Sequence, residues 1–142
     1  GCQKVVTTDK IDNVLSEADI LYLALPETPE TKNIINRKRL NLLKPSCGII
    51  NIGRQSTMDY DALKDKLNKN ELAGAILDVF TPEPIKSSSK LWDTPNLIIT
   101  PHVSSDDGES YVRLTLELFI KNLELFIAGK PLVNQIDKKL GY

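Results

Sequence analysis

The chain has 142 residues, of which 41% are hydrophobic and 26% are charged, and its formal net charge is −1. This length and composition are typical of a soluble globular protein of about one domain, and the near-neutral balance gives no electrostatic case for binding nucleic acid or an anionic membrane surface. No apolar run reaches the ~18 residues of a membrane span, no signal peptide is evident, and two cysteines are too few for a disulfide framework, so we predict a cytoplasmic protein.

The first residues predict a helix followed by a strand. Thr8 or Asp9 is placed to cap a short helix that ends near Glu17, and an apolar strand follows over residues 20–25. Pro26 is expected to end this strand, because proline has no backbone N–H with which to continue a ladder.

A loop over residues 27–31 leads to the next helix and strand. Asn36 is expected to cap a short basic helix over residues 37–43, and the second strand is predicted over residues 48–52.

A third helix precedes two further strands, which a long loop separates. Ser56 and Asp59 have the spacing of a capping box and predict an amphipathic helix over residues 59–69. Strands are expected over residues 74–79 and 97–100, and a loop rich in proline and serine separates them. The strands are apolar almost throughout, which is typical of a parallel sheet covered by helices on both faces. Strands that alternate with helices predict an α/β fold with a doubly wound parallel sheet.

The longest predicted helix covers residues 106–129. Its apolar side chains form one stripe, made of Val112, Leu116, Phe119, Leu123 and Ile127. Gly129 and Pro131 are stop signals, and residues 130–142 are expected to be a tail that docks elsewhere or frays.

Three chemically active side chains each follow a predicted strand: Arg54, Glu83 and His102. Ligands bind beyond the carboxyl ends of parallel strands, so an anion anchor, a carboxylate and an imidazole would meet at one edge of the sheet. Alone, each residue is more often a surface ion pair, a solvating loop residue or a structural histidine. Together they predict a catalytic site with His102 as the proton donor.

Asp78 is an acid at the end of an otherwise apolar strand. A buried and unpaired carboxylate is costly, so it needs a partner, which is either a backbone amide or an amide of a bound ligand. One histidine and two cysteines give no zinc or iron constellation, so no metal site is predicted. The sequence also lacks a nucleophile elbow, a P-loop and the G-x-G-x-x-G pattern.

Five segments carry a family resemblance and are listed in chain order: Leu25-Pro26-Glu27-Thr28-Pro29-Glu30-Thr31, Asn51-Ile52-Gly53-Arg54, Leu77-Asp78-Val79-Phe80-Thr81-Pro82-Glu83-Pro84, Leu91-Trp92 and Pro95-Asn96-Leu97-Ile98-Ile99-Thr100-Pro101-His102. They resemble the D-isomer-specific 2-hydroxyacid dehydrogenases, and most of all the glyoxylate/hydroxypyruvate reductase-like members. The resemblance covers about residues 15–130. It implies that residues 1–129 are the second half of a Rossmann-like NAD(P)-binding domain with its returning helix, and that residues 130–142 lead back to a substrate domain.

The resemblance also implies a role for each site residue. Arg54 would bind the substrate carboxylate and polarise the 2-oxo group, and His102 would donate a proton to the carbonyl oxygen. Glu83 would hydrogen-bond His102 and favour its protonated form, Asp78 would bind the nicotinamide carboxamide, and Trp92 would lie near the substrate or a subunit interface. The residues expected to line the cofactor, NAD or NADP, are Leu25, Pro26, Thr28, Thr31, Ile52, Gly53, Arg54, Asp78 and His102.

The implied activity is reduction of a small 2-oxo acid to a D-2-hydroxy acid. Gln55 departs from the glycine that many members have after the arginine. The glycine-rich turn, the ribose-reading residue and most of the substrate domain are expected upstream of Gly1, so we predict that residues 1–142 alone are inactive. The resemblance implies that the apolar stripe of 106–129 serves a homodimer, and a buried intrachain helix is the alternative. The alternative functions are a dinucleotide-sensing, co-repressor-like binding protein on the same fold, and a short product that serves only in assembly.

Overall fold

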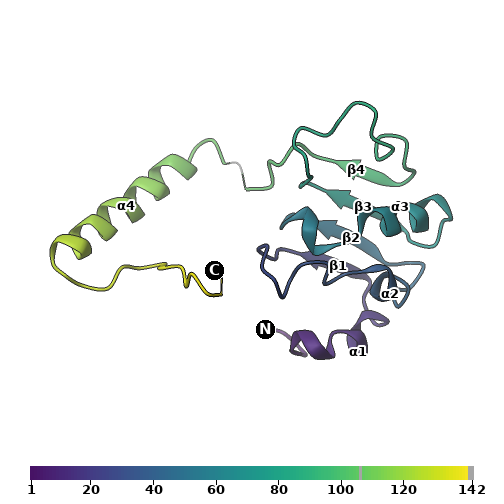
Figure 1. Ribbon diagram of the computed structural model, residues 1–142, viewed down its shortest axis with the longest axis horizontal. Coiled ribbons are helices and arrows are strands. Elements are labelled where there is room, and N and C mark those ends of the chain that lie inside the picture. Colours follow the sequence, from purple (N-terminus) through teal and green to yellow (C-terminus); the bar gives the residue numbers. More distant parts are fainter. Residues whose placement is uncertain (106, 141–142) are drawn as a thin grey trace. The chain divides into compact units, whose positions relative to one another are not determined.

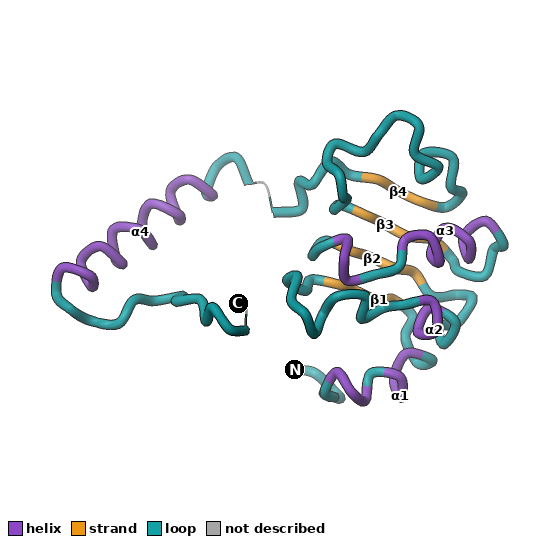
Figure 2. The backbone as a smooth tube through the Cα atoms, viewed as in Figure 1, coloured by secondary structure: helices purple, strands orange, loops and turns teal. Residues whose placement is uncertain are grey.

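The computed structural model describes residues 1–105 and 107–140. Within these residues the chain divides into two compact units, Gly1–His102 and Val103–Tyr142. The first unit carries a β-sheet with its helices, and the second carries one long helix (Figures 1 and 2). The domain limits implied by the family resemblance, 1–129 and 130–142, remain a prediction.

The described part of the first unit holds one sheet of four parallel strands in the order β1-β2-β3-β4, with the bounds Ile20–Leu23 (β1), Gly48–Asn51 (β2), Gly74–Leu77 (β3) and Leu97–Ile99 (β4). The register pairs the last residues of the strands with one another: Leu23, Asn51, Leu77 and Ile99. The carboxyl ends of these strands therefore lie in one row, and the predicted parallel α/β sheet is confirmed.

Each strand ends earlier than predicted. The first stops at Leu23 and not at Pro26, so proline is not what ends it. The last ladder bond there runs from the N–H of Ile52 to the carbonyl of Leu23 at 3.0 Å. Beyond it, the N–H of Gly53 donates to Oδ1 of Asn51 at 3.0 Å, so a side chain takes the place of the neighbouring strand.

One face of the sheet is packed and the other is open in this unit. The residues of β2 and β3 alternate between half-buried and buried. The buried face packs beneath α2 (Arg37–Leu40) and α3 (Tyr60–Asn68), which contact each other and lie over the same side of the sheet (Figure 1). The fully buried apolar side chains of this core include Ile35, Leu40, Ile49, Leu63, Leu67, Leu77 and Val79.

The described helices of this unit therefore cover one face of the sheet. Ile20, Tyr22 and Ile98 point to the opposite face and are more than half exposed in this unit. That face is as apolar as the packed one.

The first predicted helix is two short turns. The 3₁₀ turn η1 (Thr8–Lys10) and helix α1 (Asp12–Leu15) replace it, and the described N-cap residues Thr7 and Ile11 accept no hydrogen bond on their side chains. The bonds that close these turns span three residues, from Lys10 N–H to the Thr7 carbonyl and from Val14 N–H to the Ile11 carbonyl. Capping by Thr8 or Asp9 is therefore wrong.

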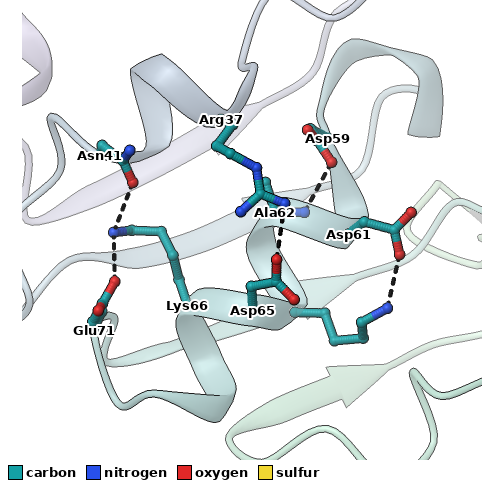
Figure 3. A network of polar contacts seen from close by, with 9 residues as sticks. Arg37, Asn41, Asp59, Asp61, Ala62, Asp65, Lys66 and Glu71 are labelled. Carbon is teal, nitrogen blue, oxygen red and sulfur yellow. Dashed lines mark hydrogen bonds and ion pairs between the residues drawn. The ribbon is translucent and has the colours of Figure 1, made fainter.

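The caps of the next two helices are set by side-chain amide and carboxylate oxygens. Oδ1 of Asn36 accepts from the N–H of Arg39 at 3.1 Å, which confirms the predicted cap, although α2 ends at Leu40. Asp59 caps α3 by accepting from the N–H of Ala62 at 2.8 Å (Figure 3). Ser56 is not part of a capping box, because it lies in the 3₁₀ turn η2 (Gln55–Thr57) and donates to Glu27.

Polar side chains link α2 to α3 on the outer side of the core (Figure 3). Arg37 pairs with Asp65 at 2.8 Å. Lys66, whose side chain is only 11% exposed, donates to Asn41 at 3.2 Å and to Glu71 at 3.1 Å. These contacts fix the helix that precedes β2 against the helix that follows it.

The second unit contains α4 (Tyr111–Ile127), which begins later than predicted. Asp106 lies outside the described residues. Oδ1 of Asp107 accepts from the N–H of Glu109 at 3.0 Å, and this turn precedes the helix. Gly129 has a φ of 64°, as its predicted role as a stop signal requires.

The side chains of α4 are not buried anywhere along its described length, and those of the predicted stripe are among the exposed large hydrophobic residues. No helix within residues 1–105 and 107–140 is long and apolar enough to cross a membrane.

Asp59→Ala removes the side-chain cap of α3. We expect it to lower the free energy of unfolding by about 1 kcal/mol, because the N–H of Ala62 loses its acceptor. Chemical denaturation of the protein measures this. Asp59→Asn is the matched control, because asparagine retains an acceptor oxygen, and an equal loss in both variants would show that the hydrogen bond is not the cause.

Candidate active site

The predicted site residues lie on the loops that leave the row of strand ends. Leu25 and Pro26 follow β1, residues 52–54 follow β2, residues 78–83 follow β3, and His102 follows β4. The sheet register therefore brings these loops to one edge, as the sequence predicts.

Glu83 and His102 are in direct contact. Oε2 of Glu83 lies 2.9 Å from Nδ1 of His102, and both side chains are about two-fifths exposed. Oε1 of Glu83 accepts from the N–H of Phe80 at 2.7 Å, so both carboxylate oxygens are used. The hydrogen bond from His102 and then that from Phe80 hold the pKa of the Glu83 carboxyl below its usual range.

His102 has an unusual backbone. Its φ is 57°, in the left-handed region that residues other than glycine rarely adopt. Such conformations persist where the surrounding structure holds them, and they are frequent at functional sites. The sequence contains no signal for this feature.

The backbone of Arg54 is fixed although its side chain is exposed. Its carbonyl accepts from Oγ1 of Thr57 at 2.7 Å and from Nδ2 of Asn51 at 3.2 Å. Asn51 and Thr57 are both fully buried, and sequence analysis does not identify them as residues that hold Arg54. The signal for Asn51 is a polar residue within the apolar run 48–52, because a buried polar side chain needs hydrogen-bond partners.

Gly53 is required by the close approach of two chain segments. A Cβ atom there would lie 2.6 Å from both the backbone N and the backbone O of Leu25. The loops after β1 and β2 are therefore in backbone contact. Gln55 stands where many members of the resembling family have glycine. It is the first residue of η2 and its φ is not positive, so this backbone does not require glycine there.

Asp78 is 1% exposed and has a partner that neither sequence-based alternative considers. Its Oδ1 accepts from the hydroxyl of Thr100 at 2.5 Å. The bond joins the ends of β3 and β4.

Thr28 and Thr31 shape the loop after β1. Oγ1 of Thr31 donates to the carbonyl of Pro26 at 2.6 Å and accepts from the N–H of Thr28 at 2.8 Å. Thr28 is 4% exposed, so its contacts within the loop leave little of it accessible. Whether these residues line a cofactor remains a prediction.

A pocket of about 290 Å³ adjoins the Glu83–His102 pair. Its lining consists of Phe80, Glu83, Pro84, Ile85, Trp92, Ile99, Thr100, Pro101 and His102. Trp92 is half exposed, and its indole N–H donates to the carbonyl of Lys86 at 3.0 Å. Arg54 is not part of this lining, so the structure brings Glu83 and His102 together and leaves Arg54 on a separate loop of the same edge.

Comparison with known proteins identifies the family. The sequence profile of the D-isomer specific 2-hydroxyacid dehydrogenase NAD binding domain matches residues 2–104. Glyoxylate/hydroxypyruvate reductase B of Pectobacterium carotovorum is 44% identical over 100 residues, which are 70% of this chain and 31% of that protein.

Solved structures give the same result. A D-isomer specific 2-hydroxyacid dehydrogenase from Xanthobacter autotrophicus in complex with NADPH and MES has a TM-score of 0.87 and 34% identity, covering 94% of this chain and 54% of that one. The NADPH-dependent glyoxylate/hydroxypyruvate reductase from Sinorhizobium meliloti, solved with NADP and sulfate, has a TM-score of 0.87 and 31% identity, covering 99% and 47%. The chain thus spans about half the length of these solved proteins.

Gly53→Ala tests the contact between the loops after β1 and β2. We expect the free energy of unfolding to fall by about 1–3 kcal/mol, because the new methyl group overlaps the backbone of Leu25. Gly48→Ala is the matched control, since a Cβ atom there meets nothing within 4 Å. Denaturant unfolding of both variants is the measurement, and similar stabilities for the two would contradict the close approach.

The Glu83 carboxyl should titrate below its ordinary pKa of 4.5. His102→Gly removes the imidazole without straining the left-handed backbone, so the pKa of Glu83 should rise towards 4.5. Side-chain carbon NMR measures both values. Because the folded-state pKa is depressed, the stabilisation from Glu83 is present above its unfolded pKa and is lost as the pH falls through the folded value.

The Asp65 carboxyl serves as the internal control in the same spectra. Its pKa is lowered by Arg37, which lies on another part of the unit, and should be the same in both proteins. An unchanged Glu83 titration in His102→Gly would mean that the pair does not form in solution.

Proposed function

Because the chain belongs to the D-isomer specific 2-hydroxyacid dehydrogenase family, we propose that the protein reduces a small 2-oxo acid to a D-2-hydroxy acid with NADH or NADPH, and catalyses the reverse oxidation. The observation that carries the proposal is the Glu83–His102 pair on the carboxyl edge of the parallel sheet. The comparisons support it through relatives named as glyoxylate/hydroxypyruvate reductases.

His102 is the proton donor in this proposal. Glu83 engages Nδ1, which leaves Nε2 as the nitrogen that carries the transferable proton. When the carbonyl carbon receives a hydride, its oxygen becomes an alkoxide, and the imidazolium neutralises it by giving up that proton. The Glu83 carboxylate holds the ring in one orientation through its contact with Nδ1. The N–H of Phe80 keeps the carboxylate in place.

Arg54 is the anchor for the substrate carboxylate. A guanidinium is always charged and forms two parallel hydrogen bonds with a carboxylate, which fixes the orientation of the attached carbonyl group. Its backbone is held by Asn51 and Thr57 while the side chain remains exposed. Nη1 of the guanidinium donates to the carbonyl of Gly53 at 2.7 Å, and its other N–H groups would meet the substrate carboxylate. The positive charge would also polarise the adjacent 2-oxo group.

The residues at this edge fit a nicotinamide dinucleotide. Asp78 supplies a buried carboxylate that can accept from a carboxamide, and the loops at residues 25–31 and 52–54 lie beyond the strand ends where open α/β sheets bind such groups. The bound cofactor supplies or accepts the hydride. Asp78 would orient the nicotinamide ring, and residues 25–31 and 52–54 would lie along the rest of the molecule.

Glyoxylate and hydroxypyruvate are the proposed substrates, because the relatives are named for them. The choice between NAD and NADP, assembly as a homodimer and cytoplasmic localisation remain predictions.

Loss of NADH or NADPH absorbance with glyoxylate, hydroxypyruvate or pyruvate tests the proposal in the intact protein. We expect oxidation that depends on the 2-oxo acid. His102→Asn should lower kcat by about 10²–10⁴-fold, because asparagine has no proton to transfer at neutral pH. Arg54→Lys should lower kcat/KM for the acid by roughly 10-fold or more, because an ammonium cannot form the paired contact.

Arg37→Lys is the control for the arginine substitution, because Arg37 pairs with Asp65 away from the site. It should leave kcat/KM unchanged. Cofactor binding without turnover of any 2-oxo acid would overturn the enzymatic proposal and favour a dinucleotide-sensing protein on the same fold.

A further inference from the structure

Tyr60 joins the two loops that carry the candidate catalytic residues. It is the first residue of α3 and is 7% exposed. Its hydroxyl donates to the carbonyl of Val79 at 2.9 Å and accepts from Nδ2 of Asn51 at 3.2 Å. One phenol oxygen therefore bonds to the last residue of β2 and to the segment that follows β3.

Asn51 extends this connection to Arg54. Its Nδ2 donates to the Arg54 carbonyl at 3.2 Å as well as to Tyr60, and its Oδ1 accepts from the N–H of Gly53 at 3.0 Å. The side chain is fully buried, so a hydrogen that loses its acceptor has no water to replace it. The geometry of residues 51–54, called the Arg54 turn below, thus depends on the position of the Tyr60 hydroxyl.

Phe80 extends the connection to His102. The rings of Tyr60 and Phe80 meet edge to face, with centroids 6.2 Å apart and an interplanar angle of 78°. The N–H of Phe80 donates to Glu83 at 2.7 Å, and Glu83 contacts His102 at 2.9 Å. Each step from Tyr60 to the imidazole is a packed contact, a hydrogen bond or a peptide bond.

We propose that Tyr60 is a positioning residue that holds the Arg54 turn and the Glu83–His102 pair in a fixed relation to each other. The inference rests on the proposed function, in which Arg54 binds the carboxylate of the substrate whose carbonyl oxygen His102 protonates. These two groups act on adjacent carbon atoms, and a misplacement of about 1 Å can lower the rate about 10²-fold. Tyr60 itself contacts no reacting atom.

The hydroxyl, and not the ring, makes the polar part of the connection. Burial raises the pKa of Tyr60 well above its usual range, so the hydroxyl keeps its proton for the carbonyl of Val79. Tyr60→Phe in the intact protein removes this group and retains the contact with Phe80.

We expect amide hydrogen exchange in residues 51–57 and 79–83 of Tyr60→Phe to rise together, by roughly 10-fold, as read by mass spectrometry. The last turns of α3 should exchange as before. The kcat/KM for the 2-oxo acid should fall roughly 10-fold, while KM for the reduced cofactor changes less than about two-fold.

Two controls separate positioning from general destabilisation. Tyr22→Phe removes a hydroxyl from a half-exposed tyrosine on the open face of the sheet and should change neither exchange nor activity. Leu67→Ala destabilises α3 at a fully buried residue outside the connection, so exchange should rise along the helix without a selective rise in the two loop segments.

Asn51→Asp is the second test. It retains an acceptor for the N–H of Gly53 and removes both donated bonds, so the paired rise in exchange should recur. A rise in only one segment, in neither, or in the pattern of Leu67→Ala would overturn the positioning role. Because exchange requires no turnover, a paired rise in a protein that reduces no 2-oxo acid would uphold the connection and overturn the proposed reaction.

Discussion

The candidate site depends on the register of one parallel sheet. Pairing of Leu23 with Asn51, of Asn51 with Leu77 and of Leu77 with Ile99 sets the four carboxyl ends in a row. A shift of one residue in any pair would displace the loop that follows and would turn its strand over. The contacts between Glu83 and His102 and between Asp78 and Thr100 each join loops or strand ends from different parts of the chain, so they require this alignment.

Beyond the strand ends, hydrogen bonds of buried polar side chains hold the loops in place, as the backbone ladder holds the strands. Asn51, Thr57 and Asp78 are each almost inaccessible to water, and each makes hydrogen bonds that fix a loop. Buried polar groups of this kind are stable only when satisfied, which makes their geometry specific. The exposed side chains of Arg54 and His102 therefore lie on loops whose backbones are held by buried hydrogen bonds.

The sequence predicts the elements of this fold better than their ends. Alternating apolar runs and helical segments suffice for the strands and for α2, α3 and α4, because each has a local cap or periodicity. Asn36 is predicted correctly as a cap, whereas Ser56 is not, because its hydroxyl finds Glu27 on a distant loop. Ile20, Tyr22 and Ile98 have the composition of buried residues, and within the described part of the first unit they are exposed.

The same limit applies to the site. The shared edge of Glu83 and His102 is predicted because each follows a strand, and parallel strands bring their ends together. The hydrogen bond between them is what the family resemblance implies, and the structure contains it. The partner of Asp78 and the buried bonds of Asn51 are not predicted, because they depend on which side chains meet across loops that are far apart in the sequence. Local pattern therefore indicates which residues share an edge, and only the tertiary structure shows which of them touch.

The left-handed backbone at His102 also restricts how this position can evolve. Glycine, asparagine, aspartate and histidine itself adopt a φ of 57° most readily, and none of the other three carries an imidazole. Substitutions that preserve the loop are therefore those that abolish its proposed chemistry. A descendant of this protein that loses the histidine is expected to keep its fold and the candidate site's other residues. Under the proposed function, this is a short mutational route from an enzyme to a binding protein.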